Sequence, residues 1–447
     1  MTANLSKHFQ QFVENISLGE PQVTRMNRAA TTVSEFLVYT YGVSKGNVFL
    51  QGSYANGTAV EPVKGGEYDI DIVVICVVRE ISCDAALNDL QAKFESDGRF
   101  KDRIKTKKPC VRLEYAEDEV GSFHVDIVPV RHLSSSAALE SPRRGEEWKP
   151  TAPREYTDWC AAQGALFVRT VKSMKRWRDE QQLVRLAVKS IVLQVLVAEC
   201  MPSGVDDAAR MAQTFRALYQ KLRVLDEPPV VPNPALLSEN LAKHWTQTSF
   251  HNFVKELAEA VEFAEAAQAS NDEVEAADLW RELLGDDFPI PSAGQLGLEL
   301  LDQSHAQTPA QKGWSEAHDS RYRVSITADV QRGRRNQNIR EVESGVLLRE
   351  GHNLHFRANV VAPNHVEVWW QVVNTGGHAR SQGGLRGDIF KGHDLKNNQI
   401  AQDEDWERTE YTGSHLIRAL LVRENRVLAA SEFFRVNIYA TGHPFTR

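Results

Sequence analysis

The sequence predicts an α+β protein in which a mixed sheet-and-helix lobe precedes a helical lobe and a small β-sandwich domain. Three observations support this fold class. Runs rich in β-branched residues at 70–75 and 125–130 have the composition of buried strands. Apolar residues recur at spacings of three and four over 164–180, as in an amphipathic helix. After residue 320, short alternating segments separated by Gly, Asn and Pro turns are typical of a sandwich.

The length, composition and net charge of the chain limit the classes of protein to which it can belong. A length of 447 residues, with 42% hydrophobic and 25% charged residues, indicates a globular chain of two or three domains. The net charge of −8 argues against a general nucleic-acid binder held by bulk electrostatics. The five cysteines are odd in number and lack metal-binding spacing. With no apolar run near 18 residues and no apolar stretch at the N-terminus, we expect a cytoplasmic protein with no membrane association.

The first lobe begins with a predicted helix over 20–41, in which Pro21 suits the first turn and Gly42 ends the periodic pattern. A helix at 84–95 and a strand at 111–115 lie between the two acidic strands. The segment 99–109, RFKDRIKTKKP, carries a run of positive charge. Such a run indicates a solvated hairpin tip or, alternatively, a patch that attracts nucleotides or an activating nucleic acid.

Three aspartates in these strands predict a metal site. Because side chains alternate along a strand, Asp69 and Asp71 point to the same face, and Asp126 lies in a second strand-like run. Converging carboxylates repel one another unless a cation neutralises them. Carboxylate oxygens favour Mg²⁺, and two such ions suit in-line phosphoryl transfer, with Mn²⁺ as a substitute. Upstream, Gly52 and Ser53 form a turn where backbone N–H groups and a hydroxyl can approach a phosphate.

The ordered set QGSYANGT, DIDI and VDIVP resembles the polymerase-β-like nucleotidyltransferases, and within them the bacterial CD-NTases of the SMODS group, relatives of cyclic GMP-AMP synthase and oligoadenylate synthase. The resemblance implies that two Mg²⁺ ions are held on the triphosphate and near the acceptor hydroxyl. The implied nucleotide-binding residues are Gln51, Gly52 and Ser53, and the implied metal-binding and catalytic residues are Asp69, Asp71 and Asp126.

Two helices predicted at 164–180 and 183–200 open the helical lobe. In the resembled family a Lys on the first helix and a Ser at the start of the second contact the triphosphate. These match Lys175 and Ser190 here, with Lys172 as the competing lysine. A solvated lysine and a capping hydroxyl are the alternative roles.

Further helices are predicted at 208–225, 235–245 and 250–269, and LWRELLGDDFP at 279–289 resembles the closing element of the SMODS helical lobe. A polar stretch without period follows and is interpreted as a linker. The predicted domains are a nucleotidyltransferase core at 1–160, a helical lobe at 161–290, a linker at 291–320 and a β-sandwich at 321–447.

Within the sandwich, the segments VEVWWQVVNTGGHARSQGGLRGDIF and TEYTGSHLIRALLV resemble the AGS-C sensor domain that is often fused to SMODS enzymes. Four residues match its motifs and could form a ligand site, although packing and turn formation also explain them: Trp370, Asn374, Arg386 and Gly387. Strands are predicted at 322–330, 354–361, 366–373, 415–423 and 427–437.

The resemblance implies a metal-dependent enzyme that makes a cyclic or short linear oligonucleotide signal from ATP, with or without GTP, CTP or UTP, and releases pyrophosphate. It further implies a role in bacterial anti-phage defence (CBASS), a downstream effector that responds to the product, and an activating cue at the C-terminal domain. Two alternatives remain at this stage. One is a polymerase-β-like transferase that adds a nucleotide to an RNA, a protein or a small molecule, and the other is a catalytically silent binding protein.

Overall fold

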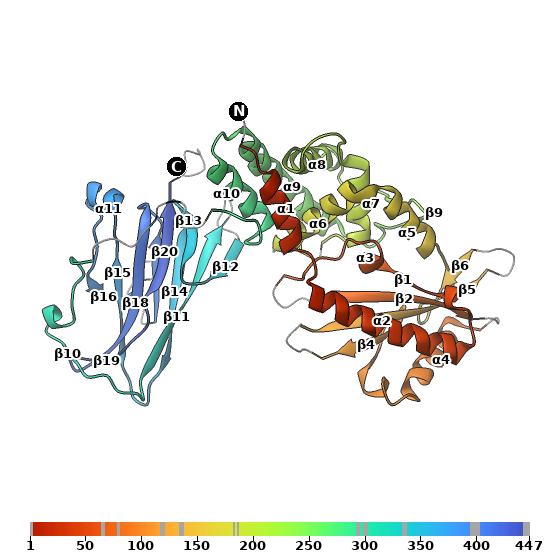
Figure 1. The fold of residues 1–447 in the computed structure, drawn as a ribbon, viewed down its shortest axis with the longest axis horizontal. Helices are drawn as coiled ribbons and strands as arrows, with labels where there is room; N and C mark the ends of the chain where they lie inside the picture. Colours follow the sequence, from red (N-terminus) through yellow and green to blue (C-terminus); the bar gives the residue numbers. More distant parts are fainter. Residues whose placement is uncertain are drawn as a thin grey trace. The chain divides into compact units, whose positions relative to one another are not determined.

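The computed structural model describes residues 3–63, 68–77, 81–116, 121–133, 138–181, 184–185, 187–291, 296, 298, 303–332, 338–393 and 403–440. Two compact units are present (Figure 1). The first comprises the chain up to Ala269 together with Leu283–Pro289, and the second comprises Ser270–Glu282 together with the chain from Ile290 onward. Within the described ranges, every helix is too short or too polar to span a lipid bilayer.

A mixed sheet of order β1-β2-β5-β4-β3 forms the centre of the first unit, with β6 and β7 continuing from β5. Strands β2 and β5 are parallel, and the other pairs are antiparallel. The strands are β1 (Val48–Gln51), β2 (Tyr68–Val77), β3 (Ile104–Thr106), β4 (Val111–Tyr115), β5 (Phe123–His132), β6 (Leu139–Ser141) and β7 (Lys149–Thr151).

Two helices, α2 (Glu20–Tyr41) and α4 (Cys83–Glu95), cover one face of this sheet (Figure 1). The apolar face of α2 packs on the inward residues of β2, Ile70, Ile72 and Val74, which are fully buried. Because alternate residues face opposite ways, Asp69 and Asp71 lie on the other face. The predicted helix over 20–41 is confirmed, and Gly42 ends it in the left-handed conformation, at φ 62°.

The remaining helices of this unit include α6, whose bounds match the prediction for 164–180 and which packs against α1, α7 and α8. The second predicted helix, 183–200, begins only at Ser190, because Lys189 has extended backbone; residues 182, 183 and 186 lie outside the described part. These helices are α1 (Ser6–Asn15), α3 (Gly52–Ala55), α5 (Pro153–Ala162), α6 (Gly164–Glu180), α7 (Ser190–Cys200), α8 (Asp207–Leu222) and α9 (Gln247–Ala269), with short 3₁₀ turns at Lys45–Asn47 and Lys101–Arg103.

The helix predicted over 235–245 is wrong. This stretch contains a short hairpin of β8 (Pro232–Asn233) and β9 (Leu236–Asn240). The Asn240 side chain accepts hydrogen bonds from the backbone N–H groups of Val231 and Ala242, at 3.1 and 2.9 Å. An asparagine that bonds nearby backbone in this way stabilises turns at the expense of helix.

The second unit is a sandwich of two sheets, of order β12-β11-β14-β17 and β10-β19-β18-β15-β16, with β20 and β13 joined to β18. Its core lies between the sheets and includes the fully buried Trp370. The strands are β10 (Ser315–Glu316), β11 (Arg323–Arg332), β12 (Asn338–Val342), β13 (Val346–Arg349), β14 (Asn353–Val361), β15 (Glu367–Val373), β16 (Ile389–Phe390), β17 (Glu404–Arg408), β18 (Gly413–Arg423), β19 (Arg426–Ala430) and β20 (Phe434–Tyr439), with helix α11 (Gly377–Ser381) and a 3₁₀ turn at Ala310–Lys312.

The described part of the predicted linker 291–320 is not extended polar chain but is bonded to the sandwich. Trp314 is buried against the half-buried Trp369 and the outer face of β18, and β10 pairs with β19. The backbone oxygen of Gln307 accepts a hydrogen bond from Gln371 Nε2 at 2.7 Å. Residues 303–319 therefore form part of the second unit, because they cover apolar side chains on its outer sheet.

Helix α10 (Glu273–Leu284) also differs from the expected position of the segment 279–289. Its residues up to Glu282 belong to the sandwich unit, whereas Leu283–Pro289 belong to the first unit. On the sandwich, the buried Arg349 forms ion pairs with Asp278 and Glu282, at 3.6 and 3.8 Å. The helix is thus held to the sandwich by charged groups that are mutually compensated.

Candidate active site

Four polar side chains form a row across the open face of the first sheet. The strand register places Gln51 of β1 opposite Asp71 of β2, Asp71 opposite Asp126 of β5, and Asp126 opposite Arg112 of β4. Residues directly opposite in a sheet share a face. Asp69, two residues before Asp71, points the same way, so the sheet brings the three predicted aspartates together on one surface.

The surroundings of Asp71 change the ionisation of its carboxyl group. Burial, then the neighbouring charges of Asp69 and Asp126, raise the pKa of Asp71 to about 8. In the absence of a cation, this carboxyl therefore holds its proton at neutral pH. A site that binds cations is expected to contain carboxylates that repel one another in this way while the cation is absent.

Gly52 lies directly against this carboxyl. It has φ +75°, and a Cβ atom there would be 2.0 Å from Asp71 Oδ2. Only glycine permits both the left-handed backbone and the close approach. The backbone of Gly52 and Ser53 therefore passes beside the acids, and the Ser53 carbonyl is fixed by a hydrogen bond from Thr58 N–H at 2.9 Å.

Asp126 is engaged by an arginine that sequence reasoning did not single out. Arg112 donates from Nε and Nη2 to the two oxygens of Asp126, at 2.7 and 2.8 Å. Among the described residues, no group of three acids or histidines is preassembled as a metal cage. The bidentate pair accounts for this in part, because both oxygens of Asp126 are already bonded to Arg112.

A cavity of about 440 Å³ opens beside the end of the row that holds Gln51 and Asp71. Seven of the eight predicted catalytic and nucleotide-binding residues line it directly: Gln51, Gly52, Ser53, Asp69, Asp71, Lys175 of α6 and Ser190. Asp126 is not part of this lining. Lys175 donates to the Thr58 carbonyl at 2.9 Å. Lys172 instead bonds Ser17 Oγ at 2.9 Å and does not line the cavity, so the geometry favours Lys175 over the competing lysine.

Burial and the nearby Arg178 lower the pKa of Lys175 to about 8. An anionic ligand in the cavity would favour its charged form. Ser190 stands at the start of α7, and its Oγ accepts a hydrogen bond from Arg178 Nη1 at 3.1 Å. The capping alternative for Ser190 is not seen, since Lys189 occupies the capping position without a side-chain hydrogen bond.

Further basic residues line the cavity that sequence reasoning missed: Arg143, Lys189, Lys243 and His244. Burial and the positive charges of Lys189, Lys243 and Arg143 lower the pKa of His244, so these cations lie near one another. They come from loops and from the chain after the hairpin β8–β9, and no motif marks them. The cavity is thus lined both by aspartates and by several basic side chains, which together suit a metal-bound polyphosphate.

Comparison with protein families assigns both units. A family described as "Second Messenger Oligonucleotide or Dinucleotide Synthetase domain" (SMODS) matches residues 1–163, and one described as "Adenylyl/Guanylyl and SMODS C-terminal sensor domain" (AGS_C) matches residues 302–439. The chain belongs to the CD-NTases. The predicted resemblance is confirmed for both parts, and the AGS_C match begins where the described chain joins the sandwich.

Characterised relatives of this CD-NTase include the cyclic AMP-AMP-AMP synthase of Acinetobacter sp., 27% identical over 300 residues, which cover 63% of this chain and 85% of the relative. The cyclic AMP-AMP-GMP synthase of Enterobacter hormaechei is 23% identical over 353 residues, with 64% and 92% covered. Among solved structures, the CD-NTase CdnG of Bradyrhizobium diazoefficiens in complex with GTP has a TM-score of 0.52 at 18% identity, covering 63% of this chain and 96% of its own. This likeness confirms the predicted α+β fold.

The acids of the CD-NTase fit divalent cations in part. Asp69 and Asp71 lie at the cavity wall, and Asp71 carries a proton that a cation would displace. Oxygen-only ligands of this kind match Mg²⁺ or Mn²⁺. Asp126 could join them only by sharing its carboxylate with Arg112 or by leaving it.

Proposed function

We propose that this CD-NTase joins nucleoside triphosphates into a cyclic oligonucleotide and releases pyrophosphate. The observation that carries the proposal is that one cavity is lined both by Asp69 and Asp71 and by Lys175, Lys189 and Lys243. Such a cavity can hold a metal-bound triphosphate, because it offers acidic side chains for the metal and basic side chains for the phosphates. The relatives named as cyclic AMP-AMP-AMP synthase and cyclic AMP-AMP-GMP synthase support the same reaction. ATP is the expected substrate, with or without a second nucleotide.

In the proposed reaction, Asp69 and Asp71 would hold two Mg²⁺ ions beside the bound triphosphate. When bound, such ions neutralise phosphate charge and lower the pKa of the attacking hydroxyl. The Gly52 and Ser53 backbone, aided by Gln51 on the same surface, positions the donor phosphates. The acceptor hydroxyl attacks the α-phosphate in line, the α–β phosphoanhydride bond breaks and pyrophosphate leaves.

In this proposal, Lys175 and Ser190 contact the triphosphate and stabilise the pyrophosphate as it leaves. Lys175 is buried beside the cavity, so its charge acts in a low-dielectric surrounding where it stabilises the departing pyrophosphate strongly. Asp126 is proposed to assist removal of the acceptor proton. Because Arg112 holds both of its oxygens, Asp126 stays aligned until substrate and cation compete for it.

We further propose that the AGS_C unit regulates the enzyme in response to a cue, and that the product signals to a downstream effector in bacterial anti-phage defence. Helix α10 supports the regulatory part, because Asp278 and Glu282 tie it to Arg349 while the helix ends in residues of the catalytic unit. A helix shared in this way gives a cue bound by the sandwich a physical route to the enzyme.

Incubation of the chain with each labelled NTP and with all four together, in Mg²⁺ or Mn²⁺, tests the reaction. Mass spectrometry should find a cyclic product and pyrophosphate. A linear product with a 5′-triphosphate would identify an oligonucleotide synthase that does not close the ring. Consumption of NTP only when an RNA, a protein or a small molecule is added would contradict the proposal in favour of a different polymerase-β-like transferase.

A further inference from the structure

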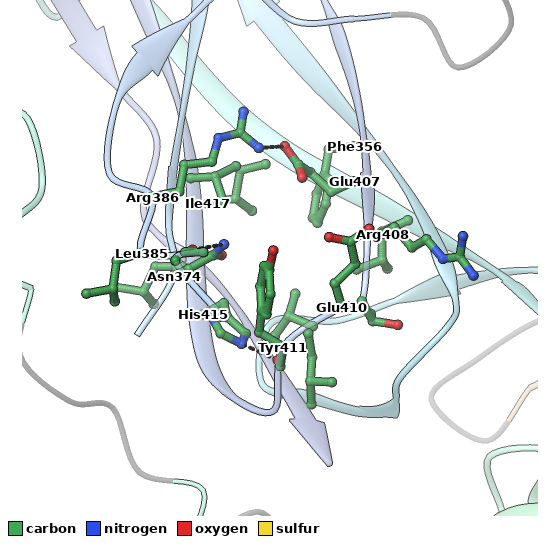
Figure 2. Close-up of a pocket in the computed structure, with 18 residues that line it drawn as sticks. Phe356, Asn374, Leu385, Arg386, Glu407, Arg408, Glu410, Tyr411, His415 and Ile417 are labelled. Atoms are coloured by element: carbon green, nitrogen blue, oxygen red, sulfur yellow. Dashed lines mark hydrogen bonds and ion pairs between the residues drawn. The ribbon is translucent and has the colours of Figure 1, made fainter. Parts of the chain in front are cut away.

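The sandwich contains a cavity of its own, of about 450 Å³ (Figure 2). It lies between the two sheets and is lined by residues of β14, β15, β17, β18 and β20, all within the second unit. It shares no residue with the active-site cavity. A cavity of this size is within the usual range for one small organic ligand.

The inner walls of this pocket are apolar. They are formed by side chains that point inward from both sheets, among them Leu354, Phe356, Val372, Ile417 and Ile438. Figure 2 shows Phe356 and Ile417 on opposite sides of the open space. A ligand buried there must therefore present a mainly apolar body.

The loop from Gly383 to Arg386 closes one side and is held by Asn374. The Asn374 Nδ2 group donates to the Gly384 carbonyl at 3.1 Å, and the Asn374 N–H donates to the Arg386 carbonyl at 2.9 Å. Among the described residues, no hydrogen bond is made to Asn374 Oδ1. This oxygen is an acceptor at the pocket wall, in a fixed position.

Tyr411 supplies an aromatic face and a hydroxyl. Its ring packs so closely on Gly384 that a Cβ atom there would be 2.3 Å from Cζ. The Tyr411 carbonyl and the Thr375 N–H both bond the His415 ring, at 2.6 and 3.2 Å, which fixes the loop. Figure 2 shows the phenol directed into the pocket, and within the described chain no hydrogen bond involves its hydroxyl.

The arginine that lines the pocket is already paired with acidic side chains. Arg386 donates to Glu407 at 2.6 Å and to Asp388 at 3.3 Å. Burial and the charge of Glu407 raise the pKa of Asp405 to about 8, so this acid is neutral at pH 7. Arg408 is exposed, and Figure 2 shows its guanidinium directed away from the pocket centre. Among the described residues that line the pocket, no cation is therefore left to neutralise a phosphate, and the nearby Glu407 and Glu410 would repel one.

We propose that this pocket binds an uncharged nucleoside, with its base between the apolar walls and beside the Tyr411 ring. A nucleobase is flat and of the right size, and aromatic side chains stack favourably on the faces of bases. Its amino or imino hydrogens meet the acceptors Asn374 Oδ1 and Tyr411 Oη. The ribose lies at the lip, where the exposed Glu410 accepts hydrogen bonds from hydroxyls.

Isothermal titration of the full-length chain with adenosine, guanosine, cytidine and uridine tests this proposal. At least one nucleoside should bind, and Tyr411→Leu should weaken that binding at least 10-fold by removing the ring face. Tyr411→Phe should weaken it about 2- to 10-fold, the loss of one hydrogen bond. Tyr39→Leu is the matched control, since Tyr39 is 90% exposed in the other unit, and it should change nothing.

A second set of titrations distinguishes binding in this pocket from binding in the active site, and binding of a nucleoside from binding of a nucleotide. Asp71→Asn should leave the Tyr411-dependent binding intact, whatever it does to catalysis. AMP should show weaker Tyr411-dependent binding than adenosine. If no nucleoside binds, if binding survives in a folded Tyr411→Leu or Tyr411→Phe variant without change, or if AMP binds this pocket more tightly than adenosine, the proposal is overturned.

Discussion

Replacing Asp71 with Asn should stabilise the metal-free protein, an unusual outcome for an active-site substitution. Asp71 has a pKa of about 8 in the folded chain because it is buried and faces Asp69 and Asp126. The unfolded chain ionises this group near pH 4. Between these values the unfolded state has lost a proton that the folded state retains, so stability falls as pH rises from about 4 to 8 and then levels off. Asn mimics the protonated acid at every pH and escapes this loss.

The size of the expected gain in stability follows from the pKa shift of Asp71. Each pKa unit corresponds to about 1.4 kcal/mol, so at pH 7 the roughly three units between pH 7 and the unfolded value give an upper limit of about 4 kcal/mol. Because the cavity admits water, we expect a measured gain of about 1–3 kcal/mol. For a unit of this size, each kcal/mol raises Tm by about 2–4 °C.

Thermal unfolding of both proteins in EDTA at pH 5, 6, 7 and 8 measures this effect. The Tm advantage of Asp71→Asn should increase with pH, and excess Mg²⁺ should reduce it by stabilising the wild type alone. Asp97→Asn is the control, because Arg99 lowers the pKa of Asp97 and its loss should not stabilise the protein. A Tm difference that is constant over this pH range, or a variant that is less stable at pH 8, would refute the reasoning.

Three further predictions concern the same site. Lys175→Ala should weaken NTP binding about 10- to 100-fold in a titration, the value of a charge-assisted hydrogen bond, whereas Lys172→Ala should leave it within about 3-fold; the reverse order would place the triphosphate elsewhere. Gly52→Ala should reduce turnover at least 10-fold, because its Cβ would overlap the Asp71 carboxylate; wild-type turnover would contradict the close packing. Arg112→Ala should lower kcat more than KM for NTP, because it frees Asp126 without touching the cavity wall, and equal changes in both would argue against a positioning role.

The strands that carry the aspartates could be predicted from sequence because their apolar residues are strongly patterned. The same pattern identified α2 and α6 with their observed bounds. The segment 235–245 could not be predicted, because its alanines and leucines favour a helix while the Asn240 side chain and the flanking prolines impose a hairpin. The docking of residues 303–319 was missed for a related reason, since Trp314 is a single apolar anchor in a polar stretch.

The aspartates that line the site were accessible to sequence reasoning because they lie in a motif, and the basic residues from its loops were not. Lys189, Lys243 and Arg143 come from separate loops and converge only in the folded chain. The pairing of Arg112 with Asp126 follows from strand register, which the sequence leaves open. In the sandwich, Asn374 and Arg386 were recognised as candidates and do line a cavity, whereas the candidate Trp370 is fully buried in the core.

The most direct test of the central claim is product analysis of the wild type beside the double variant Asp69→Asn/Asp71→Asn. Both proteins are incubated with ATP, GTP, CTP and UTP in Mg²⁺, and nucleotide products and pyrophosphate are quantified by mass spectrometry and a coupled assay. The proposed chemistry predicts a cyclic oligonucleotide from the wild type and none from the double variant, which should remain folded with an undiminished Tm in EDTA. Turnover by the double variant within 10-fold of the wild type would contradict the assignment of these two aspartates as the centre of the reaction.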